Sequence, residues 1–104
     1  MSRRVVITGV GAVSPAGPNS RAHLAGLLAG RSRARALTNP LFERFDHAIG
    51  ASVDPLPTDT VPTETDLPDL PRQVAYADLA IAEALAESGL DDAEKAATNV
   101  VAST

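Results

Sequence analysis

A cluster of prolines divides this chain into two parts that can form regular structure. Five of the eight prolines lie between Pro55 and Pro71, among threonine and aspartate residues. Proline removes a backbone donor and restricts the residue before it, so neither a regular helix nor a central strand is expected there. We therefore predict an extended surface loop at about residues 54–71, with regular elements before and after it.

The first part opens with a β-branched run. Val5–Thr8 is predicted to form a buried strand, because β-branched residues suit the packed surface of a sheet. Gly9 and Gly11 would then let the chain leave this strand sharply. A dinucleotide-binding turn would need a third glycine where Ser14 stands, and the Walker sequence is absent, so nucleotide binding is disfavoured. A twin-arginine export signal is also disfavoured, because the apolar stretch contains two glycines and a threonine.

Helical patterns follow on both sides of the proline cluster. Residues 20–30 are predicted to form a short helix with Ser20 as its N-cap and Gly30 at its end, and Gly26 within it suggests close packing against a neighbour. Residues 71–88 contain strong helix formers, and Gly89 follows them.

Shorter elements complete the pattern. One helical turn is expected near residues 41–44 and a short edge strand at residues 47–53. A turn of helix should start at Asp91 and run to about Ala97, and residues 98–104 are predicted to form a second core strand. Because the sequence ends within this apolar strand, residues 1–104 are expected to be part of a larger domain rather than a complete one.

Composition limits both the core and the chemistry of the 104 residues. Apolar residues make up 44% of the chain, but many are alanine and aromatic residues make up only 3%, so a self-sufficient core would be thin. The absence of cysteine excludes disulfides, thiolate metal sites and a cysteine nucleophile within this sequence. No apolar run reaches the length of roughly 18–20 residues that a membrane span needs. We therefore expect a soluble, cytoplasmic protein without membrane or nucleic-acid partners.

Charge is distributed unevenly. Residues 1–45 carry seven arginines and one acid, a net charge of +6, whereas residues 46–104 carry two bases and twelve acids, a net charge of −10. Arg31, Arg33 and Arg35 alternate, so in an extended segment they would share one face that could meet an acidic partner. The alternative is that they neutralise the acids of the second half.

No group of residues in the sequence has the pattern of a catalytic or metal site. His23 and His47 lack a matching partner motif and are expected to be structural or exposed. Neither Asp91–Asp92 nor the acids of the proline-rich loop have metal-ligand spacing. The candidate nucleophiles are Ser14, Ser32 and Ser103. None of them lies in the Gly-x-Ser-x-Gly sequence of a nucleophile elbow. We therefore assign no catalytic residue, cofactor site or metal ligand.

Several segments together resemble one family. "SRRVVITGVGAVSPAG", "LAGLLAGRS", "YADLAIAEALAESGL" and "NVVAST" look like the amino-terminal portion of a β-ketoacyl-acyl carrier protein synthase of the thiolase superfamily. The tripeptide "RFD" at Arg44–Asp46 is also frequent in that family. The resemblance covers nearly the whole chain but only the first part of a full family member.

The resemblance implies an α/β fold, an incomplete thiolase-like fragment in the order strand, helix, loop, helix, strand. It implies fatty acid or polyketide chain elongation by decarboxylative Claisen condensation, with catalytic cysteine, histidines and lysine outside this sequence. The expected partners are the remainder of the synthase or a ketosynthase chain, and an acyl carrier protein. Ala102–Thr104 resemble a variant found in non-catalytic chain-length-factor relatives. A non-catalytic or scaffold subunit is therefore the alternative.

Overall fold

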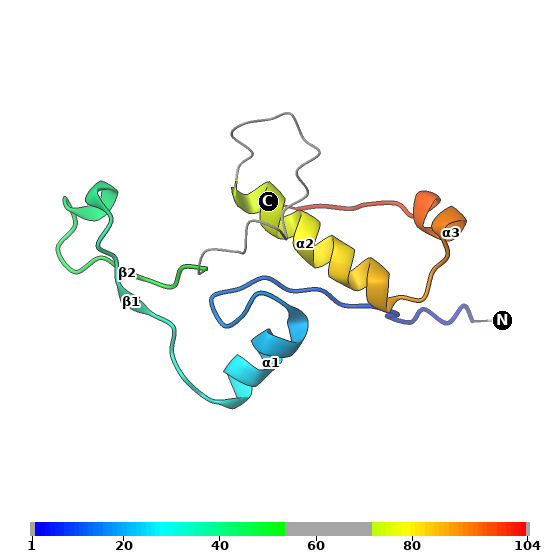
Figure 1. Ribbon diagram of the computed structural model, residues 1–104, viewed down its shortest axis with the longest axis horizontal. Helices are drawn as coiled ribbons and strands as arrows, with labels where there is room; N and C mark the ends of the chain where they lie inside the picture. Colours follow the sequence, from blue (N-terminus) through cyan, green and yellow to red (C-terminus); the bar gives the residue numbers. More distant parts are fainter. Residues whose placement is uncertain (1, 54–71, 104) are drawn as a thin grey trace.

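The computed structural model describes residues 2–53 and 72–103, so the loop predicted at residues 54–71 lies outside the described residues. The described residues form three α-helices and one two-stranded antiparallel hairpin, and Figure 1 shows how these elements are arranged. In chain order the elements are α1 (Ser20–Leu28), β1 (Arg35–Ala36), the 3₁₀ turn η1 (Pro40–Phe42), β2 (Ile49–Gly50), α2 (Arg72–Glu87) and α3 (Asp92–Ala96).

The two helices of the second part form as predicted. α2 contains a long run of strong helix formers and ends shortly before Gly89, which adopts a positive φ of 72°. α3 begins with a capping box. In this box the Glu94 backbone N–H donates to Asp91 Oδ1 at 2.8 Å, and the Asp91 N–H donates to Glu94 Oε2 at 2.9 Å.

α1 forms where expected, but its N-cap was predicted wrongly. The cap is Asn19, whose side-chain oxygen accepts from the Ala22 N–H at 2.8 Å, and Ser20 is the first helical residue. The close packing expected at Gly26 is confirmed, since a Cβ there would lie 3.0 Å from the Cβ of Ala16. Gly30, with a φ of 64°, follows the helix end.

The middle of the first part contains the hairpin. β1 and β2 pair with Arg35 opposite Gly50 and Ala36 opposite Ile49. The edge strand predicted within residues 47–53 is therefore confirmed as β2, and η1 occupies the place of the helical turn expected near residues 41–44. β1 lies in a stretch that the sequence indicated only as an irregular connection.

The predicted core strands at residues 5–8 and 98–104 are not formed in the described part of the chain. Residues 5–8 and 98–103 have irregular backbone without strand pairing (Figure 1). Their β-branched side chains are exposed, with Val5 92% and Val101 95% accessible. A strand needs a neighbouring strand to take its hydrogen bonds, and none of the described segments provides one here.

Gly9 and Gly11 serve a different purpose from the sharp turn expected of them. A Cβ on Gly11 would collide with the Ala80 carbonyl oxygen of α2, and one on Gly9 would collide with the Ala84 carbonyl oxygen. The two glycines therefore let the segment after the β-branched run lie directly on the backbone of α2.

Carboxylates of α2 hold this segment in place. Glu83 Oε2 accepts from the Ala12 N–H at 3.0 Å, and Glu87 Oε2 accepts from the Val10 N–H at 2.8 Å. Glu83 also accepts from Ser20, at 2.6 Å from the hydroxyl and 2.9 Å from the backbone N–H. The Ser20 N–H is one of the unpaired donors at the start of α1, so Glu83 caps α1 from a neighbouring helix.

These donors stabilise the ionised form of Glu83. Hydrogen bonds from the Ser20 side chain, then from the Ser20 and Ala12 backbone, hold the pKa of Glu83 below its ordinary value of 4.5. A lowered pKa favours the fold above the pKa of the unfolded chain, and this contribution disappears as pH falls through the folded-state pKa.

These contacts organise the chain without enclosing a core. None of the described residues is buried. The radius of gyration is 17.2 Å, against about 13 Å for a compact domain of this length. Large apolar side chains remain at the surface of every part of the structure, among them Ile7, Leu28, Ile49 and Val100.

Glu83→Gln should loosen the first part from α2. The amide offers one acceptor oxygen in place of two, so the bonds from Ala12 and Ser20 are not all retained. We expect faster hydrogen exchange at the amides of Ala12 and Ser20, measured by NMR. Asp78→Asn, an exposed change on the same helix, is the matched control. Equal exchange rates in both variants would contradict the role of Glu83.

Lowering the pH should loosen the first part from α2, as Glu83→Gln should. The amide signals of Ala12 and Ser20 should stay constant through the ordinary titration range of glutamate and change only at lower pH, following the lowered pKa of Glu83. An NMR titration of these amides and of the Glu83 carboxyl carbon tests this. A Glu83 midpoint at or above 4.5 would contradict it.

Gly11→Ala should displace the segment from α2, because its Cβ would overlap the Ala80 carbonyl oxygen. We expect loss of the NMR contacts between residues 9–12 and α2. Gly30→Ala is the control, since a Cβ there meets no atom within 4 Å, although its positive φ strains the new residue locally. Retention of the contacts in Gly11→Ala would show that the close approach is not required.

Candidate functional site

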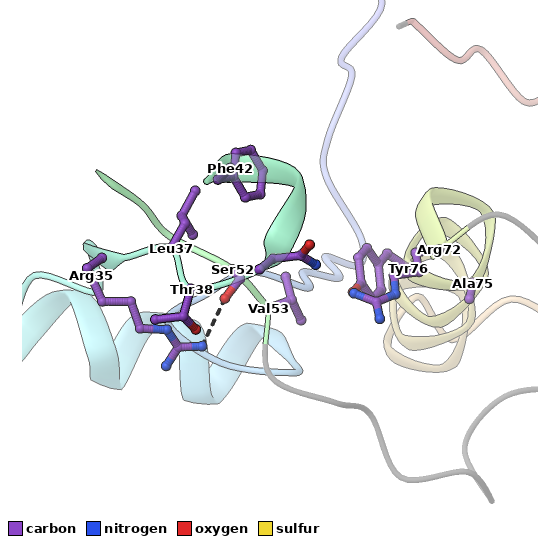
Figure 2. A pocket seen from close by; sticks show the side chains of 11 residues that line it. Arg35, Leu37, Thr38, Phe42, Ser52, Val53, Arg72, Ala75 and Tyr76 are labelled. Atoms are coloured by element: carbon purple, nitrogen blue, oxygen red, sulfur yellow. Dashed lines mark hydrogen bonds between the residues drawn. The ribbon is translucent and has the colours of Figure 1, made fainter. Parts of the chain in front are cut away.

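Two surface hollows are lined by residues of the described chain, and the larger of the two lies between the hairpin and the start of α2. It has a volume of about 530 Å³, and Figure 2 shows side chains from both elements around it. Phe42 and Leu37 contribute apolar surface from the hairpin side, and Tyr76 contributes an aromatic ring from α2. The other lining residues are Arg35, Ala36, Thr38, Asn39, Ser52, Val53, Arg72 and Ala75.

Polar contacts in this hollow are few. Arg35 Nη2 donates to Ser52 Oγ at 2.8 Å, which joins β1 to the segment that follows β2 (Figure 2). Arg72, in the first turn of α2, is the second cation on the wall, and none of the described residues that line this hollow carries a carboxylate. No nucleophile is paired with a base among the described residues that line this hollow.

The smaller hollow lies beside α1 and has a volume of about 380 Å³. In it two residues considered as catalytic candidates meet: Ser14 Oγ lies 2.7 Å from His23 Nδ1. Its remaining lining residues are Pro15, Ala16, Gly26, Leu27, Gly30, Arg31, Ser32 and Arg33.

The contacts of Ser14 hold the turn at residues 14–17 in place. The Ser14 hydroxyl oxygen also accepts from the Ala16 N–H at 3.1 Å, and the Ser14 and Gly17 backbones exchange two hydrogen bonds at 2.9 and 3.0 Å. Nucleophilic catalysis would further require a group that orients the histidine and donors for an oxyanion. Neither is recorded around this pair in the described residues.

The structure separates most of the other candidate residues. His47, with a φ of 65°, lies in the turn before β2, and Asp91 caps α3. Ser32 Oγ accepts from the Ala34 N–H at 3.2 Å. Within residues 2–53 and 72–103, no three His, Asp or Glu side chains gather into a possible metal site.

The three alternating arginines do not share one hollow. Arg31 and Arg33 line the smaller hollow, whereas Arg35 lines the larger one and bonds Ser52. Sequence reasoning found neither hollow, and it did not anticipate that Ser14 and His23 would meet. The signal in the sequence for the Ser14–His23 contact was the run of proline and glycine between Ser14 and α1, which predicts a turn that reverses the chain.

Comparison with known proteins gives one relative. Over 93 residues, 88% of the chain, the sequence is 39% identical to a protein of Streptomyces coelicolor named "Actinorhodin polyketide putative beta-ketoacyl synthase 1". The chain covers 20% of that relative's length. No family model matches the chain, and no solved structure matches it. In the described part, no helix has the length and apolar character needed to cross a membrane.

The resemblance predicted from the sequence is thereby confirmed. The chain is similar to a β-ketoacyl synthase of polyketide biosynthesis over most of its own length. In residues 2–53 and 72–103 the fold is mixed, with three helices and a two-stranded antiparallel sheet.

Proposed function

We propose that this β-ketoacyl synthase-like chain acts as the amino-terminal segment of a synthase that extends fatty acid or polyketide chains. The observation that carries the proposal is the 39% identity over 88% of the chain. The reaction would be acyl transfer to a cysteine followed by decarboxylative condensation with a carrier-bound malonyl unit. Because the 104 residues contain no cysteine, the nucleophile must belong to other polypeptide.

The exposed apolar side chains support this proposal. Ile7 is 85% accessible and Val101 95%, and both lie in segments whose backbone groups have no strand partner among the described residues. Such surfaces favour burial against further protein. The natural covering is the remaining synthase polypeptide, or a ketosynthase chain that completes the sheet.

A cytoplasmic location and an acyl carrier protein partner complete the proposal. Carrier proteins are typically acidic, and the first part of the chain is basic, with seven arginines in residues 1–45.

A non-catalytic role is the second candidate. Ala102–Thr104 resemble the variant of chain-length-factor relatives, in which the subunit would shape a partner's pocket. The two roles differ in the expected partner. The catalytic role needs a polypeptide that contains the cysteine, whereas the non-catalytic role needs a complete synthase.

A chimera tests the main proposal. Residues 1–104 would replace the matching segment of the Streptomyces relative, and condensation would be measured with carrier-bound substrates. We expect a soluble and active chimera, because the exposed segments would regain their neighbours. A soluble but inactive chimera would favour the non-catalytic role, and an insoluble one would contradict both. A chimera carrying Gly11→Ala is the control for incorrect packing.

Carrier docking can be measured in the same chimera. Replacing Arg31, Arg33 and Arg35 with serine should weaken carrier binding and reduce its dependence on salt, because three positive charges are lost. The matched control replaces Arg3, Arg4 and Arg21 with serine. Unchanged affinity and salt dependence in the first variant would show that these arginines do not dock the carrier.

A further inference from the structure

We draw no further inference here: the strongest candidate, the hollow between the β1–β2 hairpin and the start of α2, is lined by described residues none of which is buried, and nothing in the described part of the chain shows what covers it.

Discussion

The Glu83 carboxylate is the contact on which the arrangement of this chain depends. It joins α2 to the Ala12 backbone, 71 positions away, and to Ser20, 63 positions away. One side chain therefore fixes the segment before α1 and supplies the cap that the first turn of α1 needs. Glycines at positions 9 and 11 make this possible, because any side chain there would keep the segment off α2.

Polar contacts of this kind order the backbone, but they do not bury apolar surface. Burial supplies most of the free energy of folding, and none of the described residues is buried. The β-branched segments at both ends of the described structure still expose side chains such as Val6 and Val100. The described residues thus have the local geometry of a folded unit, while their large apolar side chains stay exposed.

Elements with local causes could be predicted from the sequence. α2 and α3 follow from helix formers, a capping box and a terminal glycine, all of which act within a few residues. The strands at residues 5–8 and 98–104 could not be predicted in the same way, because a strand exists only where another strand pairs with it. The N-cap of α1 was misplaced by one residue because Ser20 is a good cap by type, while its hydroxyl instead bonds Glu83.

The candidate sites were harder to predict for a related reason. Both hollows arise where segments separated in sequence come together, as when Arg35 of β1 meets Ser52 after β2. Residue types alone did not show that Arg31 and Arg33 would line a different hollow from Arg35. The family resemblance was accessible from the sequence, because it rests on several short motifs that follow one another along the chain.

Thermal unfolding of the isolated 104-residue chain, with its mass measured in solution, tests the central claim most directly. Because none of the described residues is buried, we predict a broad, non-cooperative loss of helix signal, or self-association through the exposed apolar segments. A monomer with a sharp, cooperative transition would contradict the account, because it would show that the chain encloses a core of its own.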